Sequence, residues 1–357
     1  MAYFGAPYSA ISAISPAFDR TRQFLFRPFR FWRFLKLALV AALVEGVGAS
    51  FNFGIPPSGG KTSAKPTPMP HFPWPPTPMM VAWIAAGVLV LLVLSVVISY
   101  LLIRLRFAYF DCVLTLHDEI TPGWRKYPRQ AMRYLGMNLC IGAGALVIVG
   151  SILLWMVTHF RLLWASAGPE RHISPGELVP FVLGTIIGVF VLVLVMLAIN
   201  TAMSYFMLPR MAIEDSTILD ALDDVWSDIK VEPGQFVLFM LMRLLLPAAA
   251  MMVAIVVLLI PMVVLIAVAV LVSSLLREAI QPGSILFFAV LDVVVVIIGI
   301  GIFLPAGIAI GGTIGTFVRN YALLFYGGRY PALGQLLWSP MLAISVDLPP
   351  EPGPLPG

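Results

Sequence analysis

The chain has 357 residues, of which 60% are hydrophobic and only 11% are charged, and its formal net charge is +4. Soluble domains carry about 25% charged residues, so this composition excludes a water-soluble globular protein. The two cysteines, Cys112 and Cys140, are too few for a disulfide framework and are expected to be reduced.

Residues 1–33 form a basic and aromatic segment that precedes the first long apolar run. Phenylalanine and tryptophan alternate here with Arg20, Arg22, Arg27 and Arg30. Such a pattern also suits nucleic acid, but an apolar run follows at once. We therefore expect the anionic headgroups of membrane lipids as the partner, and no nucleic acid, with Trp32 as an interfacial anchor.

Six apolar runs are long enough to cross a membrane, since about 20 helical residues span the hydrocarbon core. They lie at 34–53, 80–103, 135–157, 178–208, 236–276 and 285–318. The sequence thus predicts an all-α, polytopic membrane protein with a six-helix membrane domain over 34–326. The fifth run contains Pro247 and Pro261, and we expect one tilted helix there, with a re-entrant turn as the alternative.

Two segments rich in proline lie outside these runs. Residues 55–79 are predicted to form an extended external loop, because such a composition favours polyproline II over a packed core. Residues 327–357 are predicted to be a C-terminal tail, and its last part, 348–357, is expected to be disordered.

The distribution of lysine and arginine predicts the orientation. With six spans, most cations fall on the side that carries both termini. The opposite side has only five cations, namely Lys61, Lys65, Arg161, Arg171 and Arg277. The positive-inside rule then places both termini in the cytoplasm, and we expect the inner membrane of a bacterium.

An internal repeat organises the six spans. Each unit has an interfacial segment, a span, an external loop and a second span that ends on an arginine. The units cover about 18–111, 112–215 and 216–326. The repeat predicts three pseudo-symmetric hairpins with cytoplasmic interfacial helices. Besides Trp32, the expected interfacial anchors are Trp124, Trp226, Arg106, Arg210 and Arg319.

The interfacial segment at 217–230 is predicted to be an amphipathic helix. Thr217 and Asp220 form a plausible capping pair, and aspartates occupy the face opposite to the apolar residues. Since an acidic face does not suit an anionic membrane surface, we expect it to pair with the basic N-terminal segment through Arg22 and Arg30.

Four polar residues inside the apolar runs are the candidate site, namely Glu45, Asn200, Arg243 and Asp292. Polar groups in hydrocarbon are costly and usually face a partner or a water-filled cavity. Counting residues puts Glu45 and Asp292 in the outer half of the membrane, where they could form a protonatable pair or be hydrogen-bonded packing residues. Arg243 falls in the inner half, where it could bind a lipid phosphate or a substrate.

Motifs of known enzyme chemistry are missing from the sequence. It has no HExxH, no GxSxG and no phosphate-binding loop, and its four histidines are scattered. We therefore expect no catalytic residues, no metal site and no cofactor, and no enzymatic activity.

Short motifs at the ends of the spans carry a family resemblance. They are Pro28 with Arg33-Phe34-Leu35, the stretch from Arg106 to Asp111, and the stretch from Arg210 to Asp215 with Ala221 and Trp226. Over about 20–326 the pattern resembles a group of bacterial six-span proteins that includes the membrane domain attached to some glycerophosphodiester phosphodiesterases. The resemblance implies the six-span fold, but their catalytic domain has no counterpart here.

The function predicted from these patterns is that of an integral membrane scaffold or accessory subunit, acting through protein and lipid contacts. The alternative is a small transporter or channel with a cavity between the hairpins. A transporter should bring the four polar residues of the candidate site together, whereas a scaffold should leave them scattered.

Overall fold

A computed structural model describes residues 7–46, 77–117, 119–166, 175–279 and 285–346. Within these ranges the chain is helical and has no strand, which confirms the all-α class. The short helices are α1 (Ile14–Phe26), α2 (Phe31–Glu45), α4 (Thr121–Lys126), the π-helix η1 (Ala202–Met207), α7 (Leu208–Glu214), α8 (Ile218–Val231) and α11 (Pro331–Val346).

Five long helices coincide with the second to sixth predicted runs. They are α3 (Pro78–Thr115), α5 (Pro128–Ser166), α6 (Pro175–Thr201), α9 (Pro233–Ala279) and α10 (Ile285–Gly327). By length and composition, all five could cross a membrane. In the first predicted run the described part is α2, whose 15 residues measure about 22 Å, less than the hydrocarbon thickness of about 30 Å. The remainder of that run, 47–53, lies outside the described residues.

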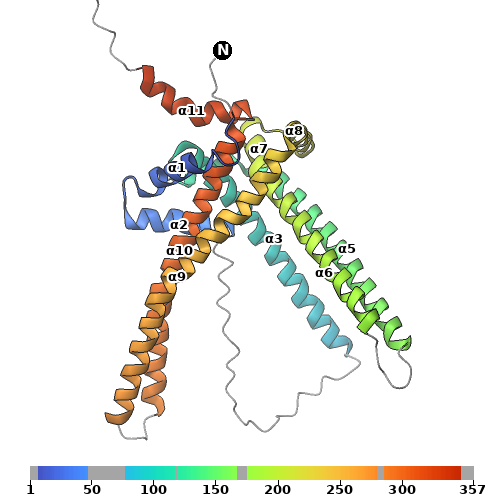
Figure 1. Cartoon of the computed structure of the whole chain (residues 1–357), viewed down its shortest axis with the longest axis vertical. Helices are drawn as coiled ribbons and strands as arrows, with labels where there is room; N and C mark the ends of the chain where they lie inside the picture. Colours follow the sequence, from blue (N-terminus) through green and yellow to red (C-terminus); the bar gives the residue numbers. More distant parts are fainter. Residues whose placement is uncertain (1–6, 47–76, 118, 167–174, 280–284, 347–357) are drawn as a thin grey trace, which may run out of the picture.

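The long helices meet at one end of the molecule and diverge toward the other (Figure 1). The pair α5 and α6 and the pair α9 and α10 extend in different directions, with α3 between them. The short helices gather where the long ones meet. We call this region the convergent end; it comprises the short helices and the adjoining buried parts of the long ones, 103–115, 127–135, 236–239 and 314–327.

Aromatic side chains form much of the core at the convergent end. The ring of Phe206 lies 5.3 Å from that of Phe239 and 5.0 Å from that of Tyr326, and the rings of Phe239 and Phe325 are 4.6 Å apart. Each such pair contributes about 0.5–1.5 kcal/mol beyond the area that it buries. By contrast, no residue is buried in the most apolar 18-residue window of any of the five long helices. Tertiary packing is therefore concentrated at one end.

A close helix crossing holds α2 on α10, and α2 lies across α10 in Figure 1. A Cβ atom added to Gly312 would stand 2.1 Å from the carbonyl oxygen of Ala38, and one added to Gly315 would stand 3.1 Å from the Cβ of Glu45. Only glycine lets two helix backbones approach so closely. The crossing fixes the end of α2, and with it Glu45, against α10.

Helix α9 is continuous from Pro233 to Ala279, with Pro247 and Pro261 inside it. The prediction of one helix for this run is confirmed, and the structure has no re-entrant turn in it. The backbone carbonyls that these prolines leave without a donor are tolerated in a helix when neighbouring groups or local adjustments satisfy them.

The N-terminal segment is partly built into the core. Helix α1 packs on α10, where the side-chain amide of Asn320 donates to the hydroxyl of Thr21 at 3.0 Å. Arg20 donates to the carbonyls of Val113 and Leu114 at the end of α3, at 3.1 and 2.9 Å. Burial lowers the pKa of Arg20 to about 10. This arginine therefore caps a helix rather than contacting lipid, whereas Trp32 is 78% exposed, as an interfacial anchor requires.

The predicted C-terminal tail contains a helix. In α11 the side chains of Leu333 and Leu337 are buried against the core of the convergent end, so the first part of the predicted tail packs on the rest of the molecule. The expected disorder of 348–357, and all of the proline-rich loop up to residue 76, lie outside the described residues.

Asp111 and Asp215, each five residues after the arginine at the end of a predicted repeat unit, both accept hydrogen bonds near the start of α5. Asp111 accepts a hydrogen bond from the hydroxyl of Tyr127 at 2.8 Å, and burial raises the pKa of Tyr127 to about 12, which keeps this hydroxyl protonated. Asp215 accepts from Gln130 at 3.0 Å and from Arg133 at 3.3 Å. Both aspartates thus contact residues between 127 and 133, although the proposed repeat puts them in different units.

Candidate functional site

A buried ion pair joins the end of α2 to α10. Glu45 is the last residue of α2, and Gly46 ends the helix in the left-handed conformation at φ 69°. The Glu45 carboxylate lies 3.3 Å from Nε of Arg319, and the two side chains are 5% and 1% exposed. The hydroxyl of Tyr205 donates to the same carboxylate. Buried charges are costly unless they are paired and hydrogen-bonded. Glu45 has both kinds of contact, whereas Nε and Nη2 of Arg319 make no hydrogen bond within the described structure.

The π-helix η1 presents its backbone to this ion pair. The N–H of Leu208 bonds to the carbonyl of Met203, five residues back. Continuing that pattern would require an N–H at position 209 for the carbonyl of Ser204, but Pro209 has none. Arg319 takes this place, since its Nη1 donates to the Ser204 carbonyl at 2.7 Å. Single π-helical turns of this kind are frequent at functional sites.

Arg106 of α3 supplies a second guanidinium. It donates to the hydroxyls of Ser204 at 3.0 Å and Tyr134 at 3.3 Å. It also donates to the carbonyl of Val44 at 3.0 Å, and so satisfies one of the last carbonyls of α2. Arg106 therefore ties α2, α5 and η1 together.

Arg243 of α9 supplies a third guanidinium. It donates to the hydroxyl of Thr201, and its central carbon lies 4.5 Å from the centre of the Tyr205 ring. No ion pair joins it to a carboxylate in the part of the chain that the structure describes. Three guanidinium groups thus surround one carboxylate, that of Glu45, which leaves two positive charges in excess. We call Glu45, Tyr205 and these three arginines the arginine cluster.

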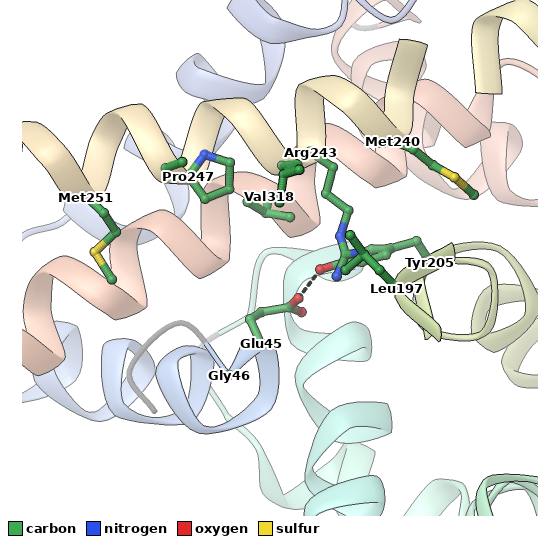
Figure 2. A pocket seen from close by; sticks show the side chains of 11 residues that line it. Glu45, Gly46, Leu197, Tyr205, Met240, Arg243, Pro247, Met251 and Val318 are labelled. Atoms are coloured by element: carbon green, nitrogen blue, oxygen red, sulfur yellow. Dashed lines mark hydrogen bonds between the residues drawn. The ribbon is translucent and has the colours of Figure 1, made fainter. Parts of the chain in front are cut away.

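A pocket of about 300 Å³ opens beside the arginine cluster. Figure 2 shows Glu45 and Arg243 approaching Tyr205 from α2 and α9. These three residues form the polar part of the wall. The rest of the wall is mostly apolar and includes Leu197, Met240, Leu244, Pro247, Ala248, Met251 and Val318. The pocket therefore offers both polar and apolar contacts to a ligand.

The structure brings together some of the predicted site residues. Glu45 and Arg243 share the pocket. The Oδ1 atom of Asn200 accepts from the Ser204 hydroxyl at 3.3 Å, and Arg106 of the arginine cluster donates to the same hydroxyl. The prediction that Glu45 lies in the outer half of the membrane assumed a span running to residue 53. Because α2 ends at Glu45, the carboxylate lies with Arg319 at the convergent end.

Asp292 does not join this group. Its backbone lies on α10, 27 residues before Arg319, which is about 40 Å along the helix, and its side chain lies outside the described residues. The alternative in which Glu45 and Asp292 form a protonatable pair is therefore wrong, because Arg319 is the partner of Glu45.

Arg106, Arg210 and Arg319, which were predicted to be interfacial anchors, are internal residues. Arg106 and Arg319 belong to the arginine cluster. Arg210 is 9% exposed and donates to Asp224 at 2.8 Å, to Asp228 at 2.7 Å and to the hydroxyl of Tyr326 at 2.6 Å. The acidic face of α8 thus pairs with Arg210 and not, as predicted, with the N-terminal segment. An arginine at the end of an apolar run looks the same in the sequence whether it faces lipid or a carboxylate.

The predicted cap of α8 is confirmed, and the tryptophans lie at partly exposed positions. The Thr217 side chain accepts from the N–H of Asp220. Trp226 is exposed, with the ammonium of Lys230 5.5 Å from its ring. Trp124 is half-buried, and the guanidinium of Arg104 lies 4.8 Å from its ring.

Replacing Arg210 by glutamine is expected to lower the free energy of unfolding by about 2–3 kcal/mol, because it removes the guanidinium that pairs with Asp224 and Asp228 and donates to the Tyr326 hydroxyl. The matched control is Arg133→Gln, whose ion pair with Asp215 is exposed and should contribute less than about 1 kcal/mol. Thermal unfolding of the two purified variants in detergent measures the difference. Equal melting temperatures would show that Arg210 does not hold α8.

Comparisons with other proteins identify a family but no function. Among the described residues, no group of three or more His, Cys, Asp and Glu side chains could hold a metal ion. The comparison with curated proteins finds no match, and neither does the comparison with solved structures. A family model matches residues 8–336, which is most of the chain. The chain belongs to this family, the family of unknown function DUF7544.

Proposed function

We propose that the protein is an integral membrane scaffold or accessory subunit that acts through lipid and protein contacts and not through catalysis. One observation carries the proposal. The convergent end has a packed core, but the most apolar windows of the five long helices contain no buried residue. Contiguous apolar faces that stay exposed mark contact surfaces, and here lipid and the helices of a partner are the available occupants.

We further propose that the convergent end faces the cytoplasm of a bacterial inner membrane, with six crossings arranged as three hairpins. The positive-inside rule supports this orientation, since Arg104, Arg125, Arg210 and Arg329 all belong to this end. The sixth crossing rests on the apolar run at 34–53, whose length is sufficient to span the hydrocarbon core.

Three of the four candidate polar residues converge, as the transporter alternative requires, but their position at one end of the helices favours the scaffold. Glu45 and Arg243 share the pocket, but the backbone of Asp292 lies about 40 Å along α10 from the arginine cluster. A translocation route would need polar groups along the depth of the membrane. The polar groups described here instead gather at one end.

Photo-crosslinking in living cells tests the scaffold. A photoreactive amino acid is placed at Val191 of α6 or Val264 of α9, both exposed. Each is expected to crosslink to one partner protein, seen as an adduct of the same mass in every repeat. The partner is then identified by mass spectrometry and checked by a reciprocal crosslink from its own side, and a second copy of this chain would count as such a partner. The control is Val231 of α8, exposed but outside the long helices, which should give no such adduct. Lipid adducts alone at Val191, Val264 and positions around them would contradict the scaffold.

A further inference from the structure

We propose that the pocket beside the arginine cluster binds the phosphate of a phospholipid headgroup, with Arg243 as its main ligand. The proposal concerns a different part of the molecule from the apolar helix faces that support the scaffold, so either can fail without the other. It rests on the charge, the depth and the lining of the pocket.

Charge is the first reason. The arginine cluster has three guanidinium groups and one carboxylate, and Arg319 and Glu45 already pair with each other. Among the described residues, Arg243 donates to the Thr201 hydroxyl and lies over the Tyr205 ring, and its side chain lines the pocket. Nη2 of Arg319 is also buried and has no hydrogen-bond partner in the described structure. Buried cations without a counter-charge are costly, and a bound anion would remove that cost.

Depth is the second reason. Arg243 lies 32 residues before Leu275, the end of the apolar stretch of α9, which is about 48 Å along the helix. Residues beyond Arg243 can therefore cross the whole hydrocarbon core of about 30 Å. This puts Arg243 near the level of the headgroups, where basic pockets between helices bind lipid phosphates.

The lining is the third reason, because it matches an amphiphile better than a free ion. Arg243 and Tyr205 supply donors and a ring face at one side of the pocket, whereas Met240, Leu244 and Met251 supply apolar surface on the same helix as Arg243. The guanidinium fork fits phosphate oxygens in bidentate geometry. The apolar residues would then contact the glycerol backbone and the first carbons of the acyl chains.

Replacing Glu45 is expected to change lipid affinity in the direction opposite to replacing Arg243. Its carboxylate lines the same pocket and would repel a phosphate there. Glu45→Gln removes this repulsion and should tighten binding of the lipid. A gain of affinity is a result that loss of fold cannot produce, so this variant separates the proposal from a purely structural role of the arginine cluster.

The experiment measures binding of dioctanoyl phosphatidylglycerol to the purified full-length protein in a non-ionic detergent. Arg243→Gln is expected to raise the apparent Kd at least about tenfold, Arg243→Lys less, and Glu45→Gln to lower it. The matched control is Arg129→Gln, an exposed arginine outside the pocket, which should change the Kd less than about twofold. Melting temperatures report whether each variant is folded.

Two further ligands identify the source of the anion. Dioctanoylglycerol has the same acyl chains without a phosphate and is expected not to compete. Inorganic phosphate is expected to compete only at far higher concentration than the lipid. If phosphate competes as well as the lipid, the lipid assignment is overturned and the pocket is a site for free anions. Equal Kd values in Arg243→Gln and Arg129→Gln would overturn the proposal altogether.

Discussion

Replacing Arg319 by glutamine is expected to destabilise the protein more than any other substitution in the arginine cluster, by about 3–5 kcal/mol. The substitution leaves the buried carboxylate of Glu45 without its counter-charge and removes the donor to the Ser204 carbonyl. Pro209 cannot supply that donor, because it has no N–H. The free energy of unfolding, measured by titration with a denaturing detergent, gives the effect.

A double-mutant cycle separates the ion pair from the rest of the arginine cluster. Glu45→Gln alone should also destabilise, since it leaves Arg319 buried without a carboxylate. The double variant is expected to be less destabilised than the sum of the single variants, because neither charge remains unpaired. Additivity of Glu45→Gln and Arg319→Gln within about 0.5 kcal/mol would show that the two side chains are not coupled.

Replacing Gly312 by alanine should separate α2 from α10. The new Cβ atom would stand 2.1 Å from the carbonyl oxygen of Ala38 and 2.3 Å from its Cα, and neither is the end of a flexible side chain. Overpacking of this kind costs about 1–3 kcal/mol, and here it also displaces Glu45 from Arg319. We expect a strongly lowered melting temperature and loss of phospholipid binding in the pocket beside the arginine cluster.

The matched control is Gly307→Ala on the same helix, where an added Cβ atom meets nothing within 4 Å. It should be neutral or slightly stabilising, because alanine favours a helix over glycine. The same melting temperature in Gly307→Ala and Gly312→Ala would mean that α2 does not cross α10 at this point.

Local features of the sequence predicted much of the fold. The helix class and the five long helices follow from the length and composition of the apolar runs, which do not depend on tertiary contacts. The cap at Thr217 follows from its spacing to Asp220, and the continuity of α9 from the length of its apolar run, in spite of Pro247 and Pro261. Each of these depends on residues close together in the chain.

The site could be predicted only in part, because its pairs are long-range. Glu45 and Arg319 are separated by most of the chain, and no local pattern links them. The sequence identified Glu45 and Arg243 as costly polar residues in apolar runs, which was sufficient to find the pocket. It assigned Arg106 and Arg319 to the lipid interface, since burial at the convergent end depends on how helices from different parts of the chain pack.

The role of η1 was missed for a similar reason. A π-helix has no strong sequence pattern, and Ser204 and Tyr205 look like ordinary residues at the end of a span. Pro209 was the one available signal, because a proline near the end of a helix leaves a carbonyl without its donor. That carbonyl is the one to which Arg319 donates.

Disulfide crosslinking in native membranes tests most directly whether the long helices diverge from the convergent end. Cys112 and Cys140 are first removed by substitution. A cysteine pair at Leu265 and Gly299, which contact each other across α9 and α10, should then crosslink rapidly under mild oxidation. A pair at Leu265 and Val191, on α9 and α6, should stay reduced. Rapid crosslinking of the second pair within one chain would mean that the helices form a closed bundle, and would contradict the divergent arrangement on which the proposed function depends.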